Sequence, residues 1–447
     1  MLENDANDTL AIQGGTVVTL NDADDVYFGG TVLINGDRID SVLPGWVHGR
    51  GRVIDATDKV VMPGLVDFHC HTALSKGWSA SLPLRDYLQS WWYPMVRSLD
   101  AESAYWAALA TYSESVKCGV TTVNDMYRQL DALADAAAAI GIRAVLSNVV
   151  ACDEHRLDTL AENERVFRTK NGSADGRVTV FVGIEWLPLA SPALLRDARS
   201  LADDLGTGIH MHLSESLAAI EMTKELFGRR PVEVAFDYGL LGPDCVAAHC
   251  LYLSERDLEL LRETQTNVSH QSSSAAWGGA GVAQLPEMLA AGLNVGLGHD
   301  SAEGNNSGDM FEVMKFTSLI QRATRCDGSL GQAGDILRMA CRNGSRGLGI
   351  EAGELAPGKK ADLIILDTNS QMFTPLMPGS KDQLYNHLVF AANGSCVESV
   401  IIDGRIVYAN RVFTTIDERE VLSEANRCFR ATVERMGAAG SRPTATP

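Results

Sequence analysis

Histidines two residues apart occur at two places in the chain. His69 and His71 stand in VDFHCH, and His210 and His212 stand in IHMHLSE. Residues two apart in an extended strand point to the same face, so both rings of such a pair can reach one ion. Neutral imidazole is a standard ligand of zinc and iron. The spacing therefore predicts a metal site, and the structural alternative is a chance His-x-His in a turn.

Three more residues that can bind a metal or move a proton lie at the ends of other strand-like segments. Asp300 ends NVGLGHD, His249 lies near the end of CVAAHC, and Glu215 follows His212 by three positions. The histidine pair of VDFHCH, together with His212 and Asp300, could hold one metal ion and leave a position open for water, as a catalytic site requires. His249 and Glu215 would then lie around that water.

Strand-like and helical patterns alternate through the middle of the chain. Helices are expected at Ala101–Lys117, Pro192–Leu205 and Met310–Ala323. The count of eight strands over ~290 residues matches a (β/α)8 barrel, whose chemistry lies at the carboxyl ends of its strands. A doubly wound sheet is the alternative, but no glycine-rich phosphate loop follows the first strand. The expected strands are 64–71, 119–125, 143–152, 178–186, 208–215, 245–250, 266–271 and 294–300.

Both ends of the chain have a different pattern, with short β-branched runs and hairpin turn signals at Asn35-Gly36 and Asp403-Gly404. They predict one small β-sandwich domain built from the two termini. We expect residues 1–62 to form its N-terminal part and residues 63–352 to form the barrel. Residues 353–447 would form its C-terminal part, with a C-terminal helix and tail.

The composition excludes several classes of function. The formal net charge is −19 over 447 residues, whereas nucleic acids and anionic membranes bind basic surfaces. No apolar run approaches the ~18 residues of a membrane-spanning helix. The nine cysteines are scattered without a CxxC pair, which is typical of a reducing compartment. We therefore expect a cytoplasmic protein with no nucleic-acid or membrane partner.

Five segments together resemble the amidohydrolase superfamily, and within it the branch of cytosine, guanine, adenosine-type and triazine aminohydrolases. They are VMPGLVDFHCH, HMHLSES, AHC, GLGHDSAEGNNSGDMF and ELAPGKKADLIILD, and the resemblance covers roughly residues 14–415. It implies a barrel flanked by a composite β-domain, which agrees with the pattern above. It also implies one divalent metal per subunit, zinc with iron as the alternative, and a small heterocyclic substrate. We further expect a homo-oligomer, a dimer or a tetramer.

The resemblance assigns a role to each residue of the predicted site. His69, His71, His212 and Asp300 match the family's metal ligands. A divalent metal lowers the pKa of bound water toward ~7. Asp300 would also take a proton from the water and deliver it to the departing amine. Glu215 would protonate a ring nitrogen, and His249 would orient the water or the substrate.

Further residues are expected near the substrate. Trp92 could stack on a flat ring, and Glu185 and Trp186 end the fourth strand. His270 and Gln271 end the seventh strand, where relatives often have His-Asn-Pro. His210 is either a partner of the ligands or a core histidine, and His299 should point away from the metal. His48, His155 and His387 fall outside the strand ends and are expected to be surface or structural residues.

Three functions remain open at this stage. The leading one is hydrolytic deamination of an aromatic N-heterocycle, or removal of an alkylamine or halide from such a ring. The second is amide or cyclic imide hydrolysis at a dinuclear site, for which VTVFVGIEW lacks the usual lysine although Glu185 could bridge two metals. The third is an assembly module without metal. The short loop after His71 and the run His270-Gln271-Ser272 depart from the family, which argues against a nucleoside or a common base as substrate.

Overall fold

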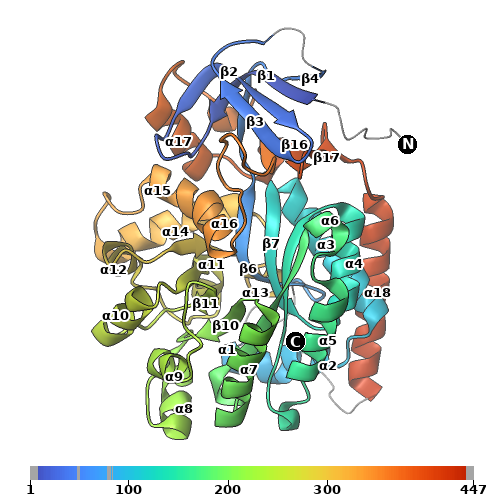
Figure 1. Ribbon diagram of the computed structural model, residues 1–447, viewed down its shortest axis with the longest axis vertical. Coiled ribbons are helices and arrows are strands. Elements are labelled where there is room, and N and C mark those ends of the chain that lie inside the picture. Colours follow the sequence, from blue (N-terminus) through green and yellow to red (C-terminus); the bar gives the residue numbers. More distant parts are fainter. Residues whose placement is uncertain (1–8, 48–50, 78–81, 83, 439–447) are drawn as a thin grey trace.

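The computed structural model describes residues 9–47, 51–77, 82 and 84–438, and in it parallel strands alternate with helices through the middle of the chain (Figure 1). Its hydrogen-bonded strands follow the order β13-β12-β11-β10-β9-β8-β7-β6-β14. β13 (Val295–Leu297) and β14 (Asp300–Ser301) are two parts of one strand, interrupted by Gly298 and His299. Because the two ends of the path are joined there, the barrel closes, and the (β/α)8 prediction is confirmed. The other strands are β6 (Leu65–His71), β7 (Val120–Tyr127), β8 (Arg143–Asn148), β9 (Val178–Trp186), β10 (Ile209–Leu213), β11 (Cys245–His249) and β12 (Asn267–His270).

Several helices begin where a side chain caps them. α3 (Ala101–Lys117) starts after Asp100, whose carboxylate accepts a hydrogen bond from the Ser103 N–H. Ser191 caps α7 (Pro192–Leu205) in the same way. α14 (Met310–Arg325) runs two residues beyond its expected end. Other helices around the barrel are α4 (Leu130–Ile140), α5 (Leu160–Lys170), α8 (Leu217–Phe227), α9 (Pro231–Asp237), α10 (Glu255–Glu263), α12 (Leu285–Ala290) and α15 (Ala333–Arg338).

Apolar side chains fill the barrel below the strand ends. Val66, Phe68, Val145, Phe181 and Val246 form one buried cluster contributed by four different strands. Layers of branched and aromatic residues are the usual filling of such a barrel. The interior of the barrel is therefore a packed apolar core, and the polar side chains gather beyond it, at the carboxyl ends of the strands.

Strands from both termini form a second sheet, which lies beyond one end of the barrel (Figure 1). β5 (Lys59–Pro63) joins the two halves, because it pairs with β1 (Thr9–Val18) on one side and with β15 (Leu363–Asp367) on the other. The expected composite β-domain is present, as one continuous sheet. Its remaining strands are β2 (Val26–Asn35), β3 (Arg38–Leu43), β4 (Arg52–Asp55), β16 (Val397–Ile402), β17 (Arg405–Ala409) and β18 (Val412–Phe413).

A buried ion-pair network fastens this sheet to the amino-terminal ends of the barrel strands. Arg143, the first residue of β8, makes two hydrogen bonds to Asp362 at 2.8 and 3.1 Å and one to Asp403 at 2.9 Å. Lys360 also reaches Asp403, at 2.9 Å. The second sheet therefore covers the end of the barrel opposite the predicted metal ligands.

The last helix returns to the barrel. α18 (Glu418–Ala438) lies along α3, with Arg435 paired to Asp100 at 3.0 Å and Lys117 paired to Glu418 at 2.5 Å (Figure 1). Its contacts are thus with the barrel, although it follows the second sheet in sequence. Among the described residues, no helix is long and apolar enough to cross a membrane.

Candidate metal centre

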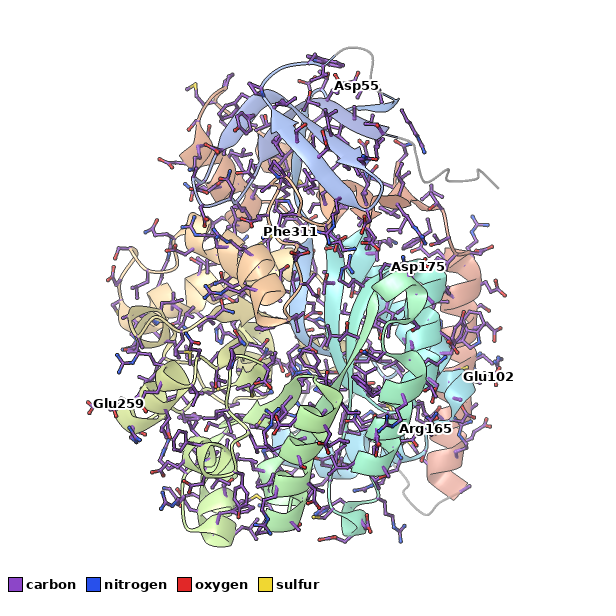
Figure 2. The ribbon with its side chains drawn as sticks, viewed as in Figure 1. Asp55, Glu102, Arg165, Asp175, Glu259 and Phe311 are labelled. Atoms are coloured by element: carbon purple, nitrogen blue, oxygen red, sulfur yellow. The ribbon has the colours of Figure 1, made fainter. Side chains whose placement is uncertain are left out.

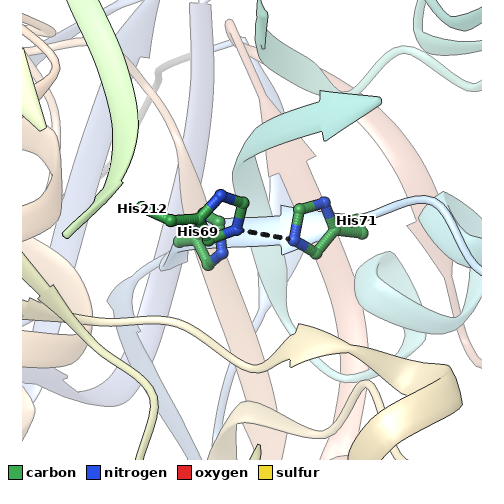
Figure 3. A group of neighbouring side chains, drawn as sticks. All are labelled: His69, His71 and His212. Carbon is green, nitrogen blue, oxygen red and sulfur yellow. Dashed lines mark hydrogen bonds between the residues drawn. The ribbon is translucent and has the colours of Figure 1, made fainter. Parts of the chain in front are cut away.

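Three imidazoles converge at the carboxyl ends of β6 and β10 (Figure 3). One ring nitrogen from each of His69, His71 and His212 lies within 4.8 Å of the others, and all three residues are buried. The Nδ1 atoms of His71 and His212 donate to the carbonyls of Met126 and Glu185, at 2.5 Å each. The Nε2 atoms of these two rings, 3.2 Å apart, therefore both present lone pairs to the same point. Such an arrangement fits a cation between them.

The third ring is fixed by a chain of hydrogen bonds. His69 Nδ1 lies 2.8 Å from His210 Nε2, and His210 Nδ1 lies 2.9 Å from Ser147 Oγ. Burial, followed by the charges of neighbouring imidazoles, lowers the pKa of His210 to about 3, so this ring is neutral. His69 Nε2 is buried and has no hydrogen-bond partner among the described residues. This orphaned atom points where a metal ligand should, and partners such as His210 orient metal-binding histidines in general.

Asp300 completes the set of donors. Its Oδ1 atom lies 3.4 Å from His71 Nε2 and 3.6 Å from His69 Nε2. Burial alone would raise the pKa of Asp300, but the contact with His69 and the charges of the surrounding imidazoles hold it well below its usual range. The residue has a φ of 68°, in the left-handed region, directly after the interruption between β13 and β14. The break in the strand thus turns the carboxylate toward the histidines.

Two groups that can move protons lie beside this cluster. His249 Nε2 is 3.8 Å from Glu215 Oε2 and 4.0 Å from Asp300 Oδ2. Burial, with smaller contributions from the charges of Glu185 and Asp300, raises the pKa of Glu215 to about 8. Its carboxyl therefore holds a proton at neutral pH, as a general acid must.

An aromatic cavity opens onto these groups. Trp92 lies edge-on to His71, with ring centroids 5.7 Å apart, and Trp186 lines the same cavity. Glu185 lines it too, and accepts a hydrogen bond from the Tyr93 hydroxyl at 3.2 Å. Its second oxygen is buried without a hydrogen-bond partner among the described residues. The cavity thus has flat aromatic walls, and burial raises the pKa of Glu185 beside them to about 7.

A second cavity adjoins the first and shares part of its wall. Residues common to both include Leu84, Leu88, Trp186 and Glu215, and the second cavity adds Leu217 and Met222 from α8. Most of these side chains are apolar. The site can therefore receive a molecule longer than one heterocyclic ring, with an apolar portion beyond the ring.

The structure places the two expected residues of the seventh strand below the cavity, outside its lining. The Gln271 side-chain oxygen accepts a hydrogen bond from the His249 N–H at 2.8 Å, and its NH2 group donates to Ser269 Oγ at 2.6 Å. His270 is buried next to His249, and burial, followed by the charge of that ring, lowers its pKa to about 4. Gln271 thus supports the backbone of His249.

The other histidines have separate surroundings. His299 is buried and hydrogen-bonded to Asp67, and it belongs to neither group of metal-binding side chains found among the described residues. His387 contacts the carbonyls of Met372 and Pro375, and His155 is partly exposed. His48 lies outside the described residues.

Two polar contacts of the site were not evident from the sequence pattern. Ser274 donates to Asp300 Oδ2 at 2.5 Å, and Tyr93 donates to Glu185. Ser274 stands in a run of three serines, and the run does not tell which hydroxyl faces inward. Tyr93 belongs to the Trp-Trp-Tyr run. A tyrosine hydroxyl in a buried aromatic cluster usually has a hydrogen-bond partner, and this could have indicated the contact.

Comparison with known proteins adds four findings. The sequence model of the amidohydrolase family matches residues 60–407. The 5'-deoxyadenosine deaminase of Methanosarcina mazei is 35% identical over 433 residues, covering 96% of this chain and 99% of that protein. The 5-methylthioadenosine/S-adenosylhomocysteine deaminase of Desulforudis audaxviator is 34% identical over 434 residues, covering 95% and 99%. A solved adenosine deaminase from Xanthomonas campestris, with bound zinc, has a TM-score of 0.88 and 24% identity, covering 96% and 98%.

Proposed function

The chain belongs to the amidohydrolase family, and we propose that it is a metal-dependent deaminase of adenine nucleosides that lack a 5' hydroxyl. Such an enzyme hydrolyses a C–N bond of an amino-substituted aromatic heterocycle and releases ammonia. One observation carries the proposal. The imidazoles of His71 and His212 and the carboxyl groups of Asp300 and Glu215 line one aromatic cavity, and His69 offers a ring nitrogen within 4.8 Å of those of His71 and His212.

We propose that His69, His71, His212 and Asp300 hold one divalent metal, zinc, with iron as the alternative. The chemistry of the donor set supports this, because three neutral imidazoles and a carboxylate suit either ion. When bound, the metal lowers the pKa of a water molecule toward ~7 and so supplies the nucleophile at neutral pH. Metal analysis of the purified protein tests the number: one equivalent is expected, and two equivalents would favour the dinuclear alternative.

The carboxylates then divide the proton transfers between them. Glu215 protonates the ring nitrogen next to the amino-bearing carbon, which makes that carbon electrophilic. Asp300 takes a proton from the attacking water and passes it to the amine nitrogen as the C–N bond breaks. His249, between the two carboxylates, orients the water, and Gln271 fixes its backbone.

The shape of the site supports a nucleoside. Trp92 and Trp186 can stack on the purine, and the apolar second cavity can receive a sugar whose 5' carbon carries hydrogen or an alkylthio group. The loop departures near His71 and His270 had argued against a nucleoside. Curated relatives that are similar to this chain over nearly its whole length nevertheless carry the names of nucleoside deaminases, which favours a nucleoside as substrate.

A substrate panel tests the proposal. Metal-loaded protein is incubated with 5'-deoxyadenosine, 5'-methylthioadenosine, S-adenosylhomocysteine, adenosine, free adenine and an amino-triazine, and ammonia release is measured. We expect the first two compounds to have the highest kcat/KM, because their 5' groups are apolar. Preference for free adenine or for the triazine would overturn the assignment.

Compartment and assembly complete the proposal. A cytoplasmic location is supported by the nine cysteines, all free in the structure. We also propose a homo-oligomer, a dimer or a tetramer, which light scattering after gel filtration tests directly. A single species at the 48.1 kDa of one chain would contradict it. The domain limits at residues 62/63 and 352/353 are likewise a proposal. Although α18 follows the C-terminal part of the β-domain in sequence, it packs on the barrel.

A further inference from the structure

The two oxygens of the Asp300 carboxylate have different surroundings. Oδ1 faces the imidazoles of His69 and His71, at 3.6 and 3.4 Å. Oδ2 faces the cavity side, 4.0 Å from His249 Nε2, and accepts a hydrogen bond from Ser274 Oγ at 2.5 Å. One carboxylate therefore presents one oxygen to the metal position and the other to the reacting groups.

Ser274 is held in place by the short helix that carries it. α11 (Ser272–Trp277) is tied to α14 by a hydrogen bond between Ser272 Oγ and Thr317 Oγ1 at 2.7 Å. At its other end, the Trp277 ring packs edge-on against Tyr87, with centroids 5.5 Å apart. Because both ends of the helix are anchored, the hydroxyl of Ser274 is a fixed donor at the wall of the cavity.

We propose that Ser274 is a positioning residue that assigns separate tasks to the two oxygens of Asp300. The terminal torsion of an aspartate side chain is broad, so the carboxylate plane needs a partner to set it. The hydroxyl donates to one lone pair of Oδ2 and leaves another lone pair free. Oδ1 then stays on the side of the ligands and Oδ2 on the side of the cavity. This inference rests on the function proposed above, because it assigns the proton transfers to Asp300.

The proton inventory of the reaction fits this arrangement. The attacking water gives its proton to the free lone pair of Oδ2, and its oxygen forms the new bond to carbon. Oδ2 then passes that proton to the amine nitrogen while the C–N bond breaks, and ammonia leaves. The second proton of the water, left on the new hydroxyl group, returns to Glu215 as the carbonyl forms and replaces the proton that Glu215 gave to the ring nitrogen. Ser274 keeps its own proton throughout.

Ser274→Ala tests the proposal together with two companion variants. We expect kcat to fall about 10- to 100-fold, the usual effect of removing a partner that orients a site residue. KM and the metal content should stay near the wild-type values, because the three imidazoles keep the hydrogen bonds that orient them and the aromatic walls of the cavity are unchanged. Ser274→Thr, which keeps the hydroxyl, should restore most of kcat. Ser273→Ala, next on the same helix but not lining the cavity, should behave as wild type.

Wild-type kcat in Ser274→Ala, or a loss of metal in proportion to the loss of activity, would overturn the proposal. A crystal structure of the metal-loaded Ser274→Ala protein gives a readout that needs no substrate. We expect its Asp300 carboxylate to be rotated, and an unchanged carboxylate plane would also overturn the proposal. If the wild-type protein deaminated none of the panel compounds, the proposed function would fail, while the rotation would still decide the role of Ser274.

Discussion

Glu215 keeps its proton at neutral pH because of where it lies: it is largely shielded from solvent, close to His249 and near two other carboxyl groups, Glu185 and Asp300. Replacing it by glutamine keeps the shape of the side chain but removes the proton that the ring nitrogen needs. We expect Glu215→Gln to lose deamination by at least ~100-fold, the scale of a positioned acid. The variant should retain its metal, because Glu215 lies outside the ligand cluster. Steady-state kinetics and metal analysis on one preparation check both parts, and near-normal turnover would refute the role.

The raised pKa of Glu215 also predicts the direction of the pH dependence. A group that must donate a proton works only below its pKa, and burial raises this pKa to about 8. We therefore expect kcat/KM to be sustained at neutral pH and to fall about tenfold per pH unit above about 8. The profile is measured with metal held at saturation. A kcat/KM that stayed constant to pH 10 would contradict this assignment.

At the scale of elements, the interruption of the eighth strand decides where Asp300 points. Gly298 lies in that interruption, against the backbone of β6. A Cβ at Gly298 would lie 2.6 Å from the carbonyl oxygen and 2.7 Å from the nitrogen of His69, so one of the two strands would have to move.

We expect Gly298→Ala to lower the free energy of unfolding by about 1–3 kcal/mol, the usual cost of overpacking, and to weaken metal binding as well. Gly328→Ala is the matched control, because a Cβ there would meet nothing within 4 Å. Urea unfolding and metal titration of both variants decide the matter. Equal behaviour of the two would show that the interruption has no such role.

The regular elements could be predicted from sequence, and the exceptions have physical reasons. α3 and α7 begin and end as expected because Asp100, Ser191 and the residues after each helix specify the ends locally. The interruption at Gly298 was not predicted, since NVGLGHD keeps the apolar pattern of a single strand. Ser274 was not singled out, because the phase of a six-residue helix within a run of serines depends on its anchoring to α14.

At the scale of the whole molecule, Arg143 connects the barrel to the second sheet from a buried position. It is 5% exposed, and its partners Asp362 and Asp403 are 2% and 8% exposed. Although burial opposes the charge, the two carboxylates raise the pKa of this guanidinium above its ordinary value. Removing the arginine would leave two buried carboxylates without their main partner.

We expect Arg143→Met to lower the free energy of unfolding by about 3–5 kcal/mol, the cost of breaking a buried pair from one side. Arg165 is the control, since it also contacts two carboxylates, those of Asp131 and Glu162, but lies at the outer surface with 46% of its side chain exposed (Figure 2). Arg165→Met should cost about 0–1 kcal/mol. Urea midpoints measure both, and a loss for Arg143→Met no larger than for Arg165→Met would contradict a fastening role.

The sequence predicted where the metal-binding side chains lie, at the carboxyl ends of the barrel strands. It did not predict which part of the molecule α18 packs against. Strand ends in a barrel meet on one face, so His69, His212 and Asp300 could be brought together from sequence alone. The position of α18 could not, because an amphipathic helix shows that it has a buried face without showing which surface covers it.

Because β5 and β15 pair in the second sheet but lie far apart in sequence, β5 is synthesised long before its partner strand. Met62 of β5 is paired with Ile364 of β15, so about 300 residues of chain, and about 15–60 s of synthesis at 5–20 residues per second, separate the two strands. During that interval β5 exposes an edge that another nascent chain could pair with. Slowing translation of the barrel segment in a reconstituted system should therefore increase aggregation, and a peptide of residues 361–367 added in trans should reduce it.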